Sequence, residues 1–441
     1  MPSLVKTKTI LGLALLAAAL FPSARQAGPA KILDLAFVPE TDGPAGAEYV
    51  EGQILVKFKP QAGVVVRAAS LVACGSRLIA RLPRLDVYVV AIPPDESVER
   101  MVEVYRRNPD VEYAEPNGYL RVELTPNDTL FKYQYALANT GQQIGSIPGS
   151  PAGRASADIK ATSGWEESKG SPEVVIAVVD TGVDLTHPDL KNKLVNAGRD
   201  FVNNDLDASD DHGHGSMVAG IAAADTNNLE GVAGVAWNSK ILPLKAIDSS
   251  GTGTTDKVAE AIRWAADNGA QVINLSLGSS LPTNTLRDAC RYAFEKGAFI
   301  AAAAGNGGQA VHYPAAYDAY VFAVAATDYN DARASFSNFG PEVDAAAPGV
   351  RTLAPYASAL TPPGYLPYAY GDGTSFATAH VSGLAALIKG LKPSLSPAQI
   401  MAVIRYSADD VNAAQAKGRD DELGYGRINL EEAIVPLKIR K

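Results

Sequence analysis

Cysteine is scarce in this chain of 441 residues, which contains only Cys74 and Cys290. Small extracellular domains often depend on several disulfide bonds, and two distant cysteines cannot supply such a framework. We expect the two thiols to stay unpaired, because the division argued below places them in different domains. The stability of the folded chain must then come from packing or from a bound metal.

A long basic segment is also lacking, and the formal net charge is −9. Nucleic-acid binding needs clustered Lys and Arg, so nucleic acid is excluded from the expected partners. Hydrophobic residues make up 47% of the chain and charged residues 20%, which is typical of a globular protein and excludes a mainly disordered one. The length predicts two domains rather than one.

Apolar runs long enough to cross a bilayer, about 20 residues, are missing as well. Residues 10–21 are apolar but too short; they follow Lys6 and Lys8 and precede small residues, as in a secretory signal peptide. We therefore assign residues 1–27 to a signal peptide and expect a secreted protein without membrane attachment after signal removal. The alternative is a membrane anchor.

Residues 28–123 precede the largest part of the chain. Residues 28–47 are rich in Ala, Gly and Pro and indicate a linker, and residues 48–123 indicate a small α+β unit. The expected elements are strands at 53–59 and 86–92, a helix at 95–107 and an extended tail at 113–123. The apolar face of the expected helix has helical spacing: Val98, Met101, Val102 and Tyr105.

Residues 124–441 form the expected main domain, in which short apolar runs alternate with helical patterns. Uniformly apolar runs are typical of parallel strands that are buried on both faces, so we predict an α/β fold with a parallel sheet between helices. The expected strands are 174–179, 241–247, 272–277, 299–304 and 321–326, and the expected helices are 257–268, 286–296, 375–391 and 397–407. Reactive groups collect at the carboxyl ends of such strands.

Four polar residues stand at ends of these elements. Asp180 and Asn306 each follow an expected strand, His214 opens a segment of small residues, and Ser375 stands at the start of a helix. Each alone has a plain explanation as a turn or helix cap. Together they supply a nucleophile, a base, an orienting carboxylate and an oxyanion donor. His212 is a rival for the base, but only His214 begins the small-residue pattern.

Segments 178–183, 214–220, 302–306 and 373–375 resemble the signatures of subtilisin-like serine proteases, in the same chain order of Asp, His and Ser. The resemblance covers about residues 125–435 and is closest to the thermitase branch. It implies a three-layer fold and a monomeric serine endopeptidase of broad specificity for proteins and peptides, with Asp180, His214 and Ser375 as triad and Asn306 as oxyanion donor. It also implies that residues 28–123 are a ferredoxin-like propeptide that helps folding, inhibits the enzyme and is removed autocatalytically.

The resemblance further implies a substrate groove made of two extended segments that pair with an extended peptide. These segments are Gly251, Thr252 and Gly253, and Ser276, Leu277 and Gly278. A second set would line the pocket for the residue before the cleaved bond: Ala303, Ala304 and Gly305. Because these side chains are small and uncharged, we expect large apolar or aromatic residues to be preferred there.

Oxygen-bearing side chains alternate in a loop before His214: Asp200, Asn203, Asp205 and Asp207. Ca²⁺ takes six to eight oxygen ligands, although a solvated acidic loop has the same composition. By resemblance, this loop binds structural Ca²⁺. A second calcium site is implied by resemblance alone, with side chains of Asp128, Asp189 and Asn228 and carbonyls of Asp225, Glu230 and Val232.

The chain departs from the family pattern at Phe376, Ala379 and Ser279, where Met, Pro and Gly are usual. None of these residues is a catalytic group. Two other functions stay open at this point: a catalytically silent binding protein on the same fold, and an esterase or lipase. The second is disfavoured because the serine lies in Gly-Thr-Ser and not in a Gly-x-Ser-x-Gly elbow.

Overall fold

The computed structural model describes residues 49–118, 125–145, 150–196 and 198–439. The expected signal peptide, the expected linker and the last residues of the expected propeptide, 119–123, lie outside these residues. Residues 49–118 and the residues from 125 onward build separate sheets, and each part is described by itself.

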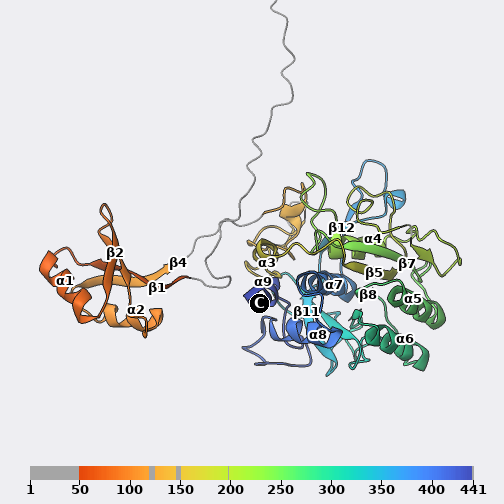
Figure 1. The fold of residues 1–441 in the computed structure, drawn as a ribbon. Helices are drawn as coiled ribbons and strands as arrows, with labels where there is room; N and C mark the ends of the chain where they lie inside the picture. Colours follow the sequence, from red (N-terminus) through yellow and green to blue (C-terminus); the bar gives the residue numbers. More distant parts are fainter. Residues whose placement is uncertain (1–48, 119–124, 146–149, 197, 440–441) are drawn as a thin grey trace, which may run out of the picture. The chain divides into compact units, whose positions relative to one another are not determined.

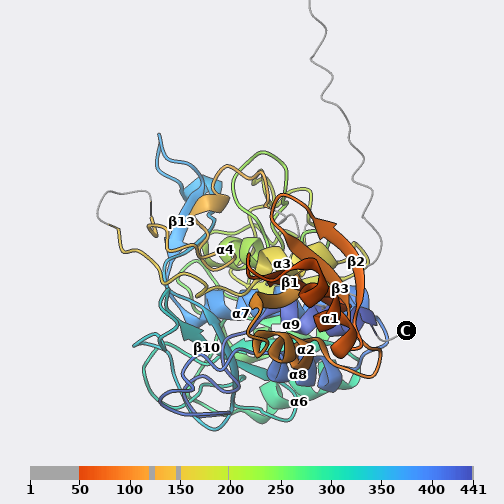
Figure 2. The ribbon, with the colours of Figure 1, turned by 90° about the vertical axis from the view of Figure 1, so that its left-hand side faces the viewer.

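The smaller part is a four-stranded antiparallel sheet in the order β2-β3-β1-β4. Its elements follow one another as β1 (Tyr49–Phe58), α1 (Val64–Ala73), β2 (Arg77–Leu82), β3 (Val87–Ala91), α2 (Val98–Arg106) and β4 (Val111–Gly118). This order of strands and helices is that of the ferredoxin-like fold. Figure 2 shows the part from a second side.

Packing of the smaller part agrees with the expected helix pattern. All four apolar residues on the predicted face of α2 are buried in a core with strand residues such as Ile54 and Val90. The hydroxyl of Ser97 accepts a hydrogen bond from the main-chain N–H of Arg100 and so caps the start of α2. Helix α1 and strand β2 were not predicted from the sequence, and the residues of β2 are exposed.

The larger part is built on a parallel sheet in the order β11-β10-β9-β8-β5-β7-β6. Its strands are β5 (Val175–Asp180), β6 (Arg199–Asp200), β7 (Lys240–Lys245), β8 (Val272–Leu275), β9 (Phe299–Ala303), β10 (Phe322–Thr327) and β11 (Val343–Pro348). The strands β12 (Thr352–Pro355) and β13 (Tyr368–Gly371) form a separate antiparallel pair, in which β12 packs against α4. The short turns are η1 (Phe131–Tyr133) and η2 (Ser358–Leu360).

Helices cover both faces of this sheet (Figure 1). They are α3 (Ala161–Glu167), α4 (His214–Ala223), α5 (Thr255–Asp267), α6 (Asn284–Glu295), α7 (Thr374–Leu391), α8 (Pro397–Tyr406) and α9 (Leu430–Ile439). Alternate residues of one strand enter two different cores: Ile176 packs with residues of α4 and α7, whereas Ala177 packs with residues of α5 and α6. The strands are therefore buried on both sides, which confirms the predicted three-layer α/β fold.

Strand order positions the functional groups. Because β9, β8 and β5 are neighbours, their carboxyl ends meet at one edge of the sheet. Helix α7 packs across β8, β9 and β10, so its first turn approaches the same edge. Both cysteines are free thiols, as predicted. Within the part of the chain that the structure describes, every helix is too short or too polar to span a bilayer.

Candidate active site

Asp180 and His214 form the polar centre of this edge. Asp180 ends β5 and is 1% exposed, and its Oδ1 lies 2.7 Å from Nδ1 of His214, the first residue of α4. The same oxygen accepts a hydrogen bond of 2.8 Å from the N–H of Thr181. The carboxylate can only accept a hydrogen bond, so Nδ1 must carry the proton of the neutral imidazole. Nε2 is then the nitrogen that can take up a further proton. His212 lines the nearby cleft, with its ring centroid 6.3 Å from that of His214.

Ser375 lies in the first turn of α7 and is held by the segment after β8. Its Oγ donates to the carbonyl of Ser276 at 3.1 Å, and the Ser276 hydroxyl donates to the carbonyl of Ser375 at 2.7 Å. The ring of the next residue, Phe376, lies 5.7 Å from the His214 ring, which brings the starts of α4 and α7 together. In this structure Oγ points to the Ser276 carbonyl, and a rotation about χ1 of Ser375 would turn it away from that carbonyl. Hydrogen bonds between catalytic groups often become short only when substrate is bound.

Asn306 follows β9 and presents its side-chain amide beside the start of α7. Its Oδ1 accepts hydrogen bonds from both the N–H and the hydroxyl of Thr374, each at 2.9 Å. With Oδ1 occupied, Nδ2 is directed to the other side, where a methyl group built on Gly373 would lie 3.5 Å from it. The same methyl group would lie 3.7 Å from the main-chain nitrogen of Ser375, so Asn306 Nδ2 and the N–H of Ser375 border the same region.

The electrostatics of the site favour the protonated form of His214. Burial lowers its pKa, but the charge and hydrogen bond of Asp180, together with the charge of Asp210, raise it more. The pKa of His214 is therefore higher than that of an ordinary histidine, about 6.5. The side chain of His214 remains 25% exposed, so solvent and ligands reach it.

A cleft of about 360 Å³ opens beside Asp180 and His214. Five predicted groove residues line it: Gly251, Gly253, Ser276, Leu277 and Gly278. Neither predicted groove segment is a strand here, because β8 ends at Leu275 and Gly251 lies in a turn with φ +78°. Among the described residues, each segment is paired only through a single bridge, between Gly253 and Ile247 and between Ser279 and Tyr313.

The three residues expected in the first substrate pocket lie at the end of β9 and directly after it, and they do not line the cleft. Ala303 is 4% exposed and Ala304 fully buried in the core. Gly305 takes φ +111°, and its N–H donates to the hydroxyl of Thr374. Its backbone turn directs Asn306 toward α7.

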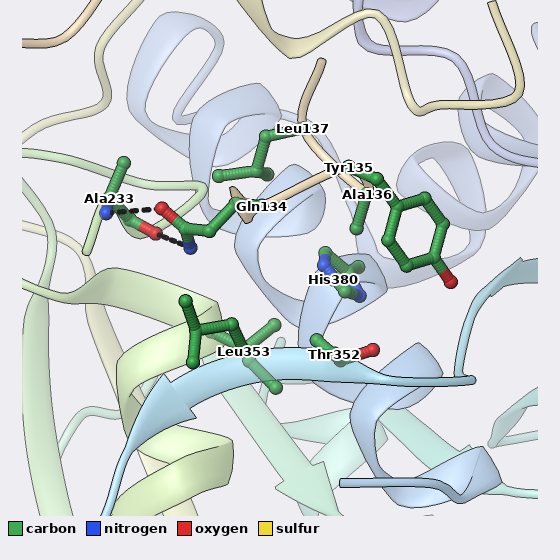
Figure 3. Close-up of a pocket in the computed structure, with 9 residues that line it drawn as sticks. Gln134, Tyr135, Ala136, Leu137, Ala233, Thr352, Leu353 and His380 are labelled. Atoms are coloured by element: carbon green, nitrogen blue, oxygen red, sulfur yellow. Dashed lines mark hydrogen bonds between the residues drawn. The ribbon is translucent and has the colours of Figure 1, made fainter. Parts of the chain in front are cut away.

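A second, internal cavity is far smaller, about 10 Å³, which is enough for roughly one water molecule. Figure 3 shows His380 of α7 beside it, together with Tyr135 and Thr352. His380 is 2% exposed, and its Nδ1–H donates to the carbonyl of Phe376. Burial lowers the pKa of His380 to about 4, so this imidazole is neutral and serves the packing of α7.

The two loops expected to bind calcium take different forms. In the loop before His214, Asp200 is buried, and its carboxylate accepts from the N–H of Val202 and Asn203 and from the Asn203 side chain. Asp205 and Asp207 each accept from a main-chain N–H two residues ahead. These carboxylates therefore shape the loop itself.

The second expected calcium cluster does gather Asp128, Asp189 and Asn228. Asp189 accepts from the Asn228 amide at 3.0 Å and from the N–H of Val232 at 2.9 Å, whereas a carbonyl of Val232 was expected to contribute. Burial raises the pKa of Asp189 to about 6. The carboxylate of Asp225 accepts from Asn192, and Glu230 N–H donates to Asn228. Among the described residues, no three His, Cys, Asp or Glu side chains form a group that could hold a metal.

Sequence reasoning missed the polar residues that connect the site. Thr181, Asp210 and Ser216 link the turn after β5 to the start of α4. Asn274 and Ser382 extend the contact of Ser276 into the core, as Ser382 donates to Asn274 and Asn274 donates to Ser276. Asn274 and Ser382 could be found as polar residues inside an otherwise apolar strand and helix, whereas Thr181 and Asp210 lie in loops and carry no such signal.

The chain matches the Subtilase family (peptidase S8) over residues 171–426, and it belongs to this family. Residues 38–117 match the Fervidolysin N-terminal prodomain. The protein is thus a subtilisin-like serine endopeptidase of the thermitase branch, preceded by a prodomain.

Similar proteins agree with this placement. The chain is 41% identical over 388 residues to a thermophilic serine proteinase of Bacillus sp. strain AK1, covering 88% of each chain. It is 43% identical over 277 residues to thermitase of Thermoactinomyces vulgaris, covering 63% of this chain and 93% of thermitase. A protease structure from Pseudoalteromonas arctica superimposes with a TM-score of 0.61 at 30% identity, over 71% of this chain and 100% of that one.

The contrast between the two histidines is testable. In spectra of ¹⁵N-histidine-labelled protein, we expect His214 to titrate above the ordinary value of about 6.5 and His380 at about 4. The change Asp180→Asn removes a negative charge and should lower the pKa of His214 while leaving that of His380 in place. A His214 pKa at or below the ordinary value in the unaltered protein would contradict the electrostatics described above.

Proposed function

We propose that this protein is a secreted endopeptidase that cleaves proteins with a triad of Asp180, His214 and Ser375. The observation that carries the proposal is the hydrogen bond from His214 to buried Asp180, beside the helix start that bears Ser375. Family membership supports peptide-bond hydrolysis, and the cleft beside the pair has room for a peptide.

In the proposed mechanism, Ser375 Oγ attacks the carbonyl carbon of the peptide bond while its proton moves to Nε2 of His214. Asp180 holds the imidazole in the required tautomer and stabilises the cation that forms. The oxyanion of the tetrahedral intermediate receives hydrogen bonds from Asn306 Nδ2 and the N–H of Ser375. His214 then returns the proton to the leaving amine, and water releases the acyl group by the same steps in reverse.

We propose that substrates bind along the cleft as an extended strand between the segments at Gly251 and at Ser276. The exposed backbone of Gly278 and Gly251 suits main-chain pairing, which reads no particular side chains. Specificity is therefore broad. We propose a preference for large apolar residues before the cleaved bond, because Ala303, Ala304 and Gly305 carry no charge; of these three, only Gly305 is partly exposed in this structure.

The remaining proposals concern the precursor. Residues 1–27 direct secretion. Residues 28–123 act as an intramolecular inhibitor and folding helper, and the monomeric enzyme cleaves them off autocatalytically. A buried parallel sheet joins strands that are distant in sequence, and such topologies fold slowly. The match of residues 38–117 to a prodomain supports a helper for this step.

We further propose structural Ca²⁺ at the two loops. Carboxylate and amide oxygens are the ligands that Ca²⁺ prefers, and both loops carry them. Asp128 and Asp189 would hold one ion together with Asn228, and Asp200 and Asp205 would hold the other together with their neighbours. Burial raises the pKa of both Asp128 and Asp189, because it disfavours their charged forms. A bound cation would favour the charged forms and so offset this effect. Bound Ca²⁺ would supply positive charge and rigidity in the loop before α4 and in the segment that follows this helix.

Replacement of the nucleophile tests the function directly. We expect Ser375→Ala to abolish casein cleavage and to leave an uncut precursor, because the alanine has no oxygen to attack the carbonyl. The measurement is casein hydrolysis together with the mass of the purified chain, and thermal unfolding controls for folding. Equal casein cleavage by both proteins would reject the protease mechanism.

The oxyanion donor gives a graded prediction. Asn306→Ala should lower kcat about 100- to 1000-fold, the size measured for the corresponding donor of subtilisin, with little change in KM. Gln309→Ala, on the same exposed loop, is the matched control and should retain kcat. A KM effect alone would place Asn306 in substrate binding instead.

Calcium removal should destabilise the enzyme. At free Ca²⁺ about 100 times Kd, ligation adds about 2.7 kcal/mol to the free energy of unfolding. Chelation should therefore lower Tm by roughly 4 °C in a domain of this size, and added Ca²⁺ should restore it. The variants Asp189→Asn and Asp205→Asn test the two loops one at a time in the same measurement. An unchanged Tm on chelation would remove calcium from the account.

A further inference from the structure

We propose that Asp210 is a positioning residue of the triad, which holds the start of α4, and with it His214, against the turn that follows Asp180. This role rests on the proposed function, since it concerns the geometry of the proposed acid and base.

Asp210 is a buried carboxylate, 7% exposed, whose two oxygens accept five hydrogen bonds. Its Oδ1 accepts from the Thr181 hydroxyl at 2.8 Å and from the N–H groups of His212 and Gly213 at 3.0 and 2.8 Å. Its Oδ2 accepts from the N–H and the hydroxyl of Ser216 at 2.9 and 2.6 Å. One side chain thus contacts the turn after β5 and the first turn of α4 at once.

Thr181 completes the connection to Asp180. Its N–H donates to Asp180 Oδ1, its hydroxyl donates to Asp210, and the same hydroxyl accepts from the N–H of Gly215 at 2.9 Å. The residue before α4 is Gly213, which has no side chain to cap the helix. Asp210 supplies the missing acceptor and also places a negative charge at the positive end of the helix dipole.

The backbone around this connection has no room for adjustment. A methyl group on Gly215 would lie 2.0 Å from the carbonyl oxygen of Gly182, and Gly182 itself has φ +104°. The turn after Asp180 and the start of α4 therefore abut directly. In such a contact, the hydrogen bonds of Asp210 decide the separation of Asp180 and His214.

Asp210 also acts on His214 through its charge. Its carboxylate contributes to the raised pKa of His214, after burial and the larger effect of Asp180. The other charged or titratable groups near this pair are Asp180 on β5, Asp184 after it, Asp211 and His212 before α4, and Lys245 on β7. Lys245 is buried; its Nζ binds the carbonyl of Thr181 and the carboxylate of Asp211, so it is already paired.

The test compares Asp210→Asn with Ser216→Ala in the matured enzyme, using kcat, KM and the pH dependence of kcat/KM on a peptide substrate. Asparagine has the shape of aspartate but no charge. Its NH₂ group would face N–H and O–H groups that donate hydrogen bonds to a carboxylate oxygen of Asp210. We expect kcat to fall about 10- to 100-fold, since a shift of about 1 Å at a catalytic group has effects of this size. KM should stay unchanged, because Asp210 does not line the cleft.

The pH profile separates positioning from simple stabilisation. Asp210→Asn removes a negative charge near His214, so the acid limb of kcat/KM should move to lower pH. Ser216→Ala removes two hydrogen bonds of Ser216 but keeps the Asp210 charge; it should lower Tm without moving the acid limb. Asp210→Glu keeps the charge and should keep the limb in place even if kcat falls.

If Asp210→Asn does not mature, the His214 pKa is measured by ¹⁵N-histidine spectra of the full chain in a Ser375→Ala background, with and without Asp210→Asn. A lower His214 pKa in the double variant supports the role. An unchanged acid limb or pKa, with kcat within twofold of the unaltered enzyme, overturns it and leaves the triad untouched. Activity of Ser375→Ala itself would instead reject the triad.

Discussion

The site depends on one constraint, the parallel pairing of β9, β8 and β5 in the middle of a sheet that is buried on both faces. Parallel strands end at the same edge, so the chain delivers Asp180, Ser276 and Asn306 to one place although they are far apart in sequence. The two helices that begin there, α4 and α7, add His214 and Ser375 at their first turns. Each helix start also leaves unpaired N–H groups at this edge.

Side chains near the site supply acceptors for several of these N–H groups, whereas Asp180 Oδ2 is buried without a hydrogen-bond partner in the described part of the chain. Asp210 satisfies the start of α4, and Thr374 with Asn306 satisfies part of the start of α7. Buried polar groups are tolerated when each has a partner, and a partnered group is also held in one position. The same hydrogen bonds that stabilise the helix starts therefore orient the catalytic groups.

The sequence predicted the parts of this arrangement that follow from periodicity and from short signatures. Uniform apolar runs predicted the central strands, and the motif order predicted the four proposed catalytic residues. It could not predict β2, whose residues are exposed, nor the short strand β6. Nor could it predict the partners of Asp210, because a hydrogen bond between Thr181 and residue 210 depends on tertiary contact and leaves no local pattern. The predicted groove strands did not form, because single bridges, of Gly253 with Ile247 and of Ser279 with Tyr313, are too short to make a strand.

The central claim is that His214 activates Ser375, and covalent labelling of the serine tests it most directly. An organophosphorus fluoride forms a bond between phosphorus and an activated serine oxygen and releases fluoride. After reaction of the matured enzyme, peptide mass mapping should find one adduct, on Ser375, and His214→Ala should abolish it at the same reagent concentration and time. An adduct on another residue, or equal labelling of Ser375 in His214→Ala, would contradict the account.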